Sequence, residues 1–215
     1  MEDKKEKQLR KYLIDEPENI EHWLRLGRYY IETYNIEKAI HHLEAAQKKF
    51  SNPEICSMLA KAYKLVGQEE KAIFSYLRCL SLNPQDYKCI IGLGKLYLEM
   101  GLYDDAERVI SDANKFYPEK IEPYILLAKL YLEKRDYQRA LYLAKIGYDL
   151  AKSNNTPTHK NIALAESSLI LGKILYALGD ISAARYYIEL TLKIVPSNIA
   201  AREILNRIYS SISNK

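Results

Sequence analysis

Apolar and small residues recur along this chain with the period of an α-helix, and the pattern itself repeats at longer intervals. In each repeat a leucine stands directly before a small residue, and a tyrosine or leucine follows three positions after it. Positions i, i+1 and i+4 lie on one face of a helix, so this face must be buried. An alanine twelve positions further on marks a second helix. The small residues are Gly27, Ala60, Gly94, Ala128 and Gly172, and the alanines are Ala39, Ala72, Ala106, Ala140 and Ala184.

The spacing of the small residues predicts an array of helix pairs. Successive small residues are 33, 34, 34 and 44 positions apart, which fits a helix–turn–helix unit repeated five times with one insertion. Glycine inside a helix costs about 1 kcal/mol relative to alanine, so the three glycines indicate close contact between paired helices. Pro84, Pro118 and Pro196 close repeats two, three and five, where proline ends one helix and tolerates the start of the next.

The pattern resembles the tetratricopeptide repeat family. The fourth repeat is looser, with Gly147 at its later small position, and the fifth has Leu175 in place of the tyrosine. The resemblance implies an all-α, right-handed superhelical solenoid of antiparallel helix pairs. In the first repeat the family signature is matched by Trp23, Leu26, Gly27, Tyr30, Ala39 and Ala46.

We expect five repeats over residues 20–196, flanked by caps that cover the open ends of the stack. The caps are an N-terminal helix within residues 1–19, which looks like half a repeat, and a C-terminal helix within 197–215. A helical pattern that runs to Lys152 and resumes by Asn161 predicts a loop between longer helices. This insertion near 153–162 is either a tolerated surface loop or a partner-contacting edge. The expected repeats span about 20–52, 53–86, 87–120, 121–154 and 165–197.

Composition agrees with one continuous folded unit. The chain has 215 residues, of which 48% are hydrophobic and 28% charged. The N-terminal stretch lacks the apolar core of a secretory signal, and no apolar run approaches the roughly eighteen residues of a membrane helix. We therefore expect a cytoplasmic protein without a membrane span.

Residues that could carry chemistry have simpler structural interpretations. The chain has three cysteines, an odd number, and no two of them have CxxC spacing, which favours packing over metal or redox roles. They are Cys56, Cys79 and Cys89. His41 and His42 are helix neighbours whose side chains diverge, so we expect surface residues rather than metal ligands. The glycine pair around Leu93 follows no strand and is no phosphate loop. We expect no enzyme, no cofactor and no metal.

In the related family the first helix of each pair lines a concave groove. The position after each small residue is always basic, which predicts a ladder of cations that attracts a carboxylate-rich segment. The alternative is a solvated face in which Glu32, Glu99 and Glu133 neutralise cations four residues before them. The predicted ladder consists of Arg28, Lys61, Lys95, Lys129 and Lys173.

Apolar residues flank these cations and predict an exposed strip on the same face. Such a strip bordered by charge is typical of a partner site for a segment with apolar and acidic residues. The competing explanation is that the C-terminal helix or the longer helices of the fifth repeat fill the groove. The predicted strip residues are Ile91, Leu98, Ile125, Leu132 and Tyr176.

These observations predict a non-enzymatic adaptor or co-chaperone-like scaffold that binds a protein or peptide in its groove. The carboxylate clamp of one chaperone-binding subgroup is disfavoured, because Leu24 and Arg28 replace its lysine and asparagine, although Lys88 matches a later lysine. A self-assembling homo-oligomer and a regulatory subunit of a larger complex remain alternatives. RNA binding is disfavoured, because the net charge is only +4 and tyrosines such as Tyr63 occupy packing positions.

Overall fold

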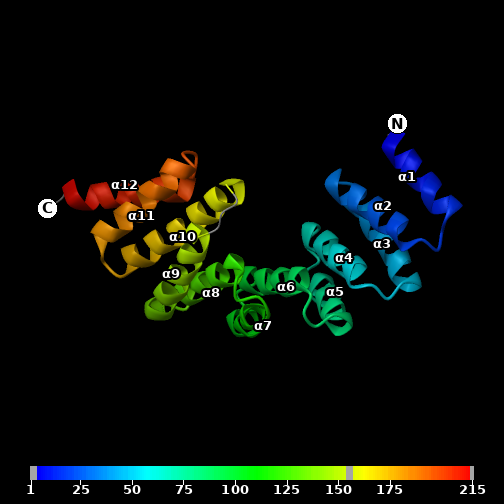
Figure 1. Cartoon of the computed structure of the whole chain (residues 1–215), viewed down its shortest axis with the longest axis horizontal. Coiled ribbons are helices and arrows are strands. Elements are labelled where there is room, and N and C mark those ends of the chain that lie inside the picture. The colour runs from blue at the N-terminus through cyan, green and yellow to red at the C-terminus, as the bar shows by residue number, and fades with distance from the viewer. Residues whose placement is uncertain (1–3, 154–156, 214–215) are drawn as a thin grey trace. The chain divides into compact units, whose positions relative to one another are not determined.

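The computed structural model describes residues 4–153 and 157–213, and every regular element within them is a helix (Figure 1). This confirms the prediction of an all-α solenoid of helix pairs. The helices are α1 (Lys4–Asp15), α2 (Ile20–Glu32), α3 (Ile36–Lys49), α4 (Pro53–Leu65), α5 (Glu69–Leu82), α6 (Tyr87–Glu99), α7 (Tyr103–Phe116), α8 (Ile121–Glu133), α9 (Tyr137–Ser153), α10 (Pro157–Ala177), α11 (Ile181–Ile194) and α12 (Ile199–Ser213).

The chain divides into two compact units, residues 1–100 and 101–215, where the sequence suggested one continuous unit. In a solenoid each repeat contacts only its neighbours, so the packing of one unit depends little on a distant one. Unit 1 contains α1 to α6, and unit 2 contains α7 to α12. Each unit is described below by itself.

Capping residues start the first helices of unit 1. The side chain of Asn19 accepts a hydrogen bond from the backbone N–H of Glu21, and Asn52 accepts from Glu54 and Ile55. At the start of α6, the side chain of Asp86 accepts a hydrogen bond from the backbone N–H of Cys89. Each cap satisfies an amide that lacks a partner inside the helix, which fixes where the first helix of the repeat begins.

A residue in the left-handed conformation lies in the turn of every helix pair. Glycine holds this position in three repeats, at Gly67, Gly101 and Gly179, whereas Tyr34 and Arg135 hold it in the other two with φ of 57° and 60°. Only glycine adopts this conformation without steric cost. Two of the five turns therefore fold against the local preference of their residue.

Small residues bring the paired helices together as predicted. A Cβ added to Gly27 would lie 2.6 Å from Leu43 Cδ2, and one added to Gly172 would lie 2.6 Å from Ile188 Cδ1. These neighbours stand four residues after the predicted contact alanines Ala39 and Ala184, both fully buried. The glycines thus make room for a branched side chain of the second helix.

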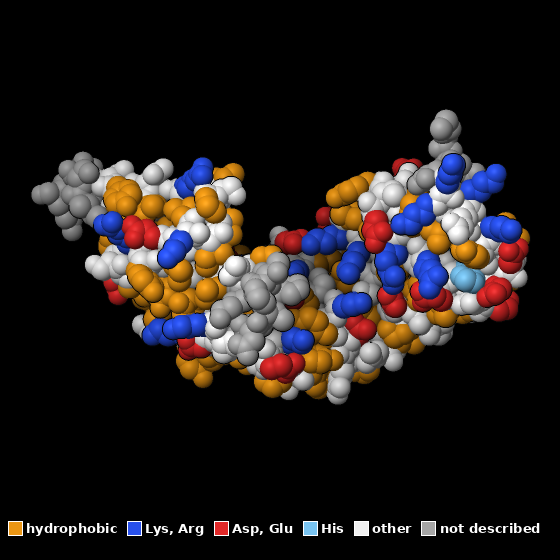
Figure 2. All heavy atoms as spheres, turned by 45° about the horizontal axis from the view of Figure 1, so that its top comes forward, with side chains coloured by type: hydrophobic (Ala, Val, Ile, Leu, Met, Phe, Trp, Pro, Cys, Tyr) orange, Lys and Arg blue, Asp and Glu red, His pale blue; other side chains and the backbone are white. Residues whose placement is uncertain are grey.

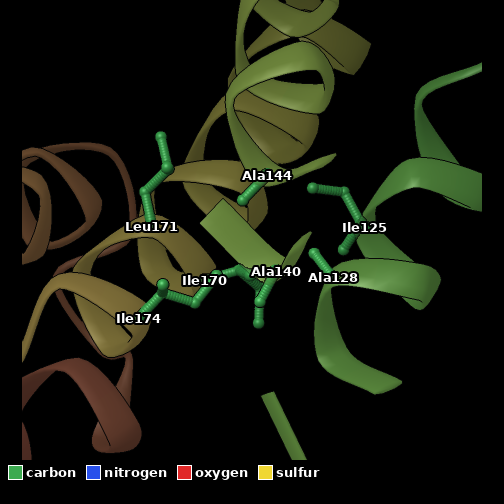
Figure 3. Close-up of a cluster of buried hydrophobic side chains, with 7 residues drawn as sticks. All are labelled: Ile125, Ala128, Ala140, Ala144, Ile170, Leu171 and Ile174. Carbon is green, nitrogen blue, oxygen red and sulfur yellow. The ribbon is translucent and has the colours of Figure 1, made fainter. Parts of the chain in front are cut away.

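The core of unit 2 joins three successive helices (Figure 3). Short side chains from α9 lie between longer ones from α8 and α10, so that the three helices interlock. Tyr131, Leu132 and Tyr187 pack around this cluster while half-buried. The cluster consists of Ile125, Ala128, Ala140, Ala144, Ile170, Leu171 and Ile174.

The helices beside the insertion are longer than the others, as predicted. Helices α9 and α10 have 17 and 21 residues, against 13 or 14 in α2 to α8. Helix α10 begins at Pro157, four residues before the expected start, because proline fits the first turn of a helix. The predicted loop falls mostly on residues 154–156, which lie outside the described residues.

At the end of unit 2, α12 (Ile199–Ser213) lies within the range 197–215 expected for a C-terminal helix. Its Ile208 is fully buried and packs with Leu175 and Ala184. Among the helices that the structure describes, none combines the length and the apolar character that crossing a bilayer requires.

Candidate functional site

A cavity of about 290 Å³ lies between the first helices of three successive repeats in unit 1. Helix α4 packs against both α2 and α6, so residues far apart in sequence share one surface. The lining includes two residues of the predicted ladder, since Arg28 and Lys61 each follow the small residue of their helix. The cavity is lined by Arg28, Ile31 and Glu32 of α2, Glu54, Ser57, Met58 and Lys61 of α4, and Lys88 of α6.

Charges in this cavity are only partly balanced. Arg28 pairs with Glu54, with 3.0 Å between Nη2 and Oε1. Neither Lys61 nor Lys88 has an ion-pair partner among the described residues, and Lys61 is exposed. Figure 2 shows Lys and Arg side chains crowded on the face of unit 1 presented in that view. The lining thus carries three cations against two carboxylates, Glu32 and Glu54.

Ser57 adds an unmet hydrogen-bonding group to the cavity wall. Its side chain is 3% exposed, and its Oγ has no hydrogen-bond partner within the described part of the chain. A buried hydroxyl without a partner costs about 1–3 kcal/mol. A ligand atom that donates to or accepts from Ser57 would recover part of this free energy.

The alternative, in which carboxylates of the same helix neutralise the cations, does not hold for Arg28 and Lys129. Arg28 contacts Glu54 rather than Glu32, and Lys129 contacts Glu166 on α10 at 2.7 Å. A cation that precedes its carboxylate is the weaker orientation for a pair within a helix, whereas the neighbouring first helix brings a carboxylate directly opposite. Such exposed pairs contribute only about 0–1 kcal/mol, so the cations stay available to ligands.

The remaining cations of the predicted ladder differ in their surroundings. Lys95 of α6 and Lys173 of α10 are both half-buried. Glu99, which the alternative assigned to Lys95, forms an ion pair with Lys64 of α4, with 2.7 Å between Oε1 and Nζ. Whether any ladder residue binds a ligand stays a prediction.

The predicted exposure of the apolar strip is wrong for Ile91 and Ile125, whose side chains are only 5% and 2% exposed. Ile125 belongs to the core of unit 2 and contacts the backbone of α9, since a Cβ added to Gly147 would lie 2.9 Å from its Cδ1. The position four residues before Lys129 thus faces the second helix of its repeat instead of solvent. Leu98 and Leu132 are half-buried, and the latter packs against the same core.

Tyr176, the last residue of the predicted strip, is half-buried beside the cluster of Leu175, Ala184 and Ile208. Ile208 of this cluster comes from the C-terminal helix α12. The competing expectation, that the C-terminal helix or the longer helices of the fifth repeat fill the groove, stays a prediction.

Tyrosines of the first helices make a recurring contact that the sequence pattern did not reveal. Each hydroxyl donates to a glutamate on the preceding second helix, and a cation from the following second helix lies over the ring. The hydrogen bonds join Tyr30 to Glu6 at 2.9 Å, Tyr63 to Glu44 at 2.5 Å and Tyr131 to Glu107 at 2.6 Å. The cations are Lys38, Lys71 and Arg139, at 5.7, 5.4 and 5.3 Å from the ring centroids.

This contact locks three consecutive helices together. Burial and the neighbouring Glu44 carboxylate raise the pKa of Tyr63 to about 12, which keeps its hydroxyl a donor at neutral pH. The tyrosines thus hold repeats in register, and their hydroxyls are committed to protein contacts.

Cys79 and Cys89 form a disulfide, so the interpretation of these residues as packing residues alone is wrong. The bond joins the last turn of α5 to the first turn of α6, with the Cα atoms 6.3 Å apart. Both cysteines are fully buried, and a carboxylate oxygen of Asp86 lies within 4.8 Å of both sulfur atoms. Cys56 is free and buried, as expected.

His42 is also not the surface residue that the sequence suggested. Its ring stacks on Trp23 with centroids 5.0 Å apart, and its Nε2 donates to the Trp23 carbonyl at 2.9 Å. Burial lowers the pKa of His42, which favours the neutral ring. His41, by contrast, is exposed as expected.

Comparison with known proteins gives matches in sequence and in fold. A family model described as tetratricopeptide repeat matches residues 66–130. The BBSome complex member BBS4 of Bos taurus is 33% identical over 140 residues, which cover 65% of this chain and 24% of that protein. The TPR repeat-containing protein YpiA of Bacillus subtilis strain 168 is 25% identical over 187 residues, 86% of this chain and 42% of that protein. The chain thus spans less than half the length of these relatives.

Solved structures share the fold at low sequence identity. Pseudomonas aeruginosa PilF superposes with a TM-score of 0.76 at 18% identity, covering 93% of this chain and 86% of that one. YrrB, described as a TPR protein with an unusual peptide-binding site, gives 0.67 at 12% identity, with coverages of 91% and 96%. A likeness at this level of identity reports architecture alone.

Proposed function

Because the chain is a tetratricopeptide repeat protein, we propose that it is a non-enzymatic scaffold that binds a partner polypeptide in the cavity between α2, α4 and α6. Its fold is that of protein-interaction scaffolds in general. The partner segment proposed here carries acidic and apolar side chains. One observation carries the proposal: Lys61, Lys88 and the buried Ser57 hydroxyl converge on one cavity without partners among the described residues.

The chemistry of the cavity supports an acidic and apolar ligand. A carboxylate between Lys61 and Lys88 would gain charge-assisted hydrogen bonds, which are roughly twice as strong as neutral ones. Ile31 and Met58 supply apolar wall for a neighbouring side chain, and methionine adapts to irregular shapes. Both requirements are met by one short peptide segment.

The arrangement of the wall supports a polypeptide rather than a small molecule. Three helices from three repeats contribute side chains to a surface open to solvent, which suits an extended or helical segment. The peptide-binding site named for YrrB shows that a protein of this fold can recognise a peptide. We propose that Lys95 in unit 1 and the two ladder lysines of unit 2, Lys129 and Lys173, also contact the partner polypeptide.

A capture experiment with matched charge changes tests this proposal. Purified protein is compared with a Lys61→Glu/Lys88→Glu variant and with a control, Lys145→Glu/Lys152→Glu, which alters two exposed lysines of α9 by the same charge. Bound proteins from cell lysate are identified by mass spectrometry, and circular dichroism verifies equal helicity. We expect a partner that the wild type and the control retain and the cavity variant loses.

Two results would contradict the proposal. Retention of every partner by the cavity variant would exclude the cavity as the binding site, and equal loss by both variants would indicate a nonspecific charge effect. Light scattering of the free protein separates the alternative of self-assembly, because a homo-oligomer would grow with concentration in the absence of any partner.

A further inference from the structure

Three side chains of the kind that bind metal ions meet where α5 ends and α6 begins (Figure 1). Cys79 lies in the last turn of α5, Cys89 lies in the first turn of α6, and Asp86 caps the start of α6. The two sulfur atoms and a carboxylate oxygen of Asp86 all lie within 4.8 Å of one another. Among the described residues, no other three histidine, cysteine or carboxylate ligands come as close together. None of the three residues lines the cavity of the proposed function.

This set of side chains is specific to the joint between α5 and α6, residues 79–89. At the corresponding positions of two other joints there is no thiol, imidazole or carboxylate. The position of Cys79 is held there by a fully buried alanine, so the packing that the repeats share does not require a thiol. The corresponding residues are Ala46, Asn52 and Ile55 at the joint of α3 with α4, and Ala113, Lys120 and Pro123 at the joint of α7 with α8.

The disulfide between Cys79 and Cys89 engages both sulfur atoms, so a metal ion can bind only after its reduction. A dithiol reductant supplies two electrons: its own sulfur atoms form a disulfide, and the two cysteines become thiols. Each thiol then releases its proton to solvent as its sulfur binds the ion. Both cysteines stand in terminal helix turns, which open locally more readily than helix centres, so the buried bond can be reached.

The geometry of the joint suits a shared ion as well as a disulfide. Two thiolates on one tetrahedral ion, each about 2.3 Å from the metal, are about 3.8 Å apart. The Cα atoms of Cys79 and Cys89 are already 6.3 Å apart, so this separation of the sulfur atoms requires only a small movement of the side chains. Reduction therefore leaves two thiols within reach of one ion.

The start of α6 orients the carboxylate and favours a thiolate. The backbone N–H of Cys89 donates to Asp86 Oδ1 at 2.9 Å, which holds the carboxylate beside both sulfur atoms. A carboxylate has lone pairs on both oxygens, so this hydrogen bond leaves room for a metal contact. The positive end of the helix dipole stabilises negative charge in the first turn, where Cys89 lies. The ligands are thus positioned by the cap of the helix.

We propose that Cys79, Cys89 and Asp86 bind a zinc ion when the disulfide is reduced. Two thiolates and a carboxylate suit Zn²⁺, which accepts sulfur and oxygen ligands in tetrahedral geometry, whereas Mg²⁺ and Ca²⁺ require oxygen ligands. Water takes the fourth position. The joint between α5 and α6 is therefore crosslinked in both redox states, by the disulfide or by the ion. The expectation of no metal rested on the lack of CxxC spacing, but here two helix ends bring the thiolates together.

Cobalt is the spectroscopic probe for this site, because Co²⁺ bound by thiolates gives charge-transfer absorption in the near ultraviolet. The protein is reduced with a phosphine and titrated with Co²⁺ in metal-free, anaerobic buffer, and Zn²⁺ is then added. We expect saturation at one Co²⁺ per chain and its displacement by Zn²⁺, which loses no ligand-field stabilisation in a tetrahedral site. The oxidised protein should give no such absorption. Its absence from the reduced protein up to about 1 mM Co²⁺ would overturn the proposal.

Variants that keep the fold identify the ligands. Cys79→Ala/Cys89→Ala should lose the thiolate absorption, and Cys56→Ala, which removes the third thiol, should keep it. Asp86→Asn retains a good helix cap but not the anionic ligand, so we expect at least about tenfold weaker Zn²⁺ binding at unchanged helicity by circular dichroism. Absorption that persists in the double variant, or that disappears in Cys56→Ala, would place the metal elsewhere and refute the site. Unchanged affinity in Asp86→Asn would contradict the role of the carboxylate.

Discussion

The disulfide between Cys79 and Cys89 should stabilise unit 1 by an amount set by the loop that it closes. The two cysteines are 10 residues apart in sequence. For a loop of this size the lost conformational entropy of the unfolded chain corresponds to about 2–3 kcal/mol. Reduction of the bond should lower the free energy of unfolding by that amount while the helices remain formed.

Three proteins isolate this effect from loss of packing. The wild type is compared with Cys79→Ala/Cys89→Ala and with Cys56→Ala, which removes one buried sulfur without a crosslink. Alanine suits the first site, because Ala46 and Ala113 are fully buried at the corresponding positions of other repeats. Any loss in the Cys56 variant measures the packing contribution of a single buried sulfur.

The assay is urea unfolding followed by circular dichroism, with and without a phosphine reductant. The wild type and the Cys56 variant should each lose about 2–3 kcal/mol on reduction, and the double variant should be insensitive to it. Alkylation of the denatured, unreduced wild type should modify Cys56 alone. Modification of all three cysteines, together with an unfolding curve that reductant does not move, would refute the crosslink.

Two further predictions concern the turns and the buried carboxylate. Tyr34→Gly should raise the free energy of unfolding by about 0.5–1 kcal/mol in urea titrations, because Tyr34 holds φ of 57° while its side chain is 83% exposed. Gly67→Ala is the matched control and should lower the free energy of unfolding. A lower free energy of unfolding in the Tyr34→Gly variant would contradict the idea that Tyr34 has a strained backbone. Burial would raise the pKa of Glu6, but the hydrogen bonds from Tyr30 and Lys38 lower it overall. The lowered pKa stabilises the folded state at pH values above the ordinary pKa of glutamate, and this stabilisation is lost as the pH falls through the pKa of Glu6 in the folded protein. Glu6→Gln should therefore flatten the dependence of the free energy of unfolding on pH between about pH 6 and pH 3. An unchanged slope in this variant would contradict the role assigned to Glu6.

Periodicity predicts much of this fold because solenoid packing is local. The small residue and the alanine twelve positions later meet within one helix pair, so their contact follows from a single repeat. The same logic anticipated the close approach at Gly27 and the longer α9 and α10. A contact that repeats with the sequence can be found from the sequence.

The repeat pattern did not predict contacts that depend on the rotation of a helix about its axis or on single residues. Ile125 fits an apolar groove position by spacing, yet the helix turns it onto Gly147 of α9. Gly92 belongs to no repeat position that calls for a small residue. In the structure, however, a Cβ added to it would lie 2.5 Å from the ring of Tyr76 on the preceding helix. The disulfide between Cys79 and Cys89 forms because the end of α5 lies beside the start of α6. The spacing of the cysteines in the sequence does not predict this contact.

The candidate site was predicted only in part for the same reason. The basic position after each small residue placed Arg28 and Lys61 on a shared surface, as their common cavity shows. Lys88 joins them through the packing of α4 against α6, which no single repeat encodes.

The tyrosine contacts mean that the repeat in the sequence and the cooperative unit in space do not coincide. Each of these tyrosines donates to a glutamate on the helix before its own repeat, whereas the cation over its ring comes from the second helix of the same repeat, as with Glu6, Tyr30 and Lys38. Excising a repeat at its sequence boundaries would therefore orphan a buried hydroxyl on one side and a carboxylate on the other. A repeat transplanted into another array should be cut one helix earlier, so that its glutamate travels with it.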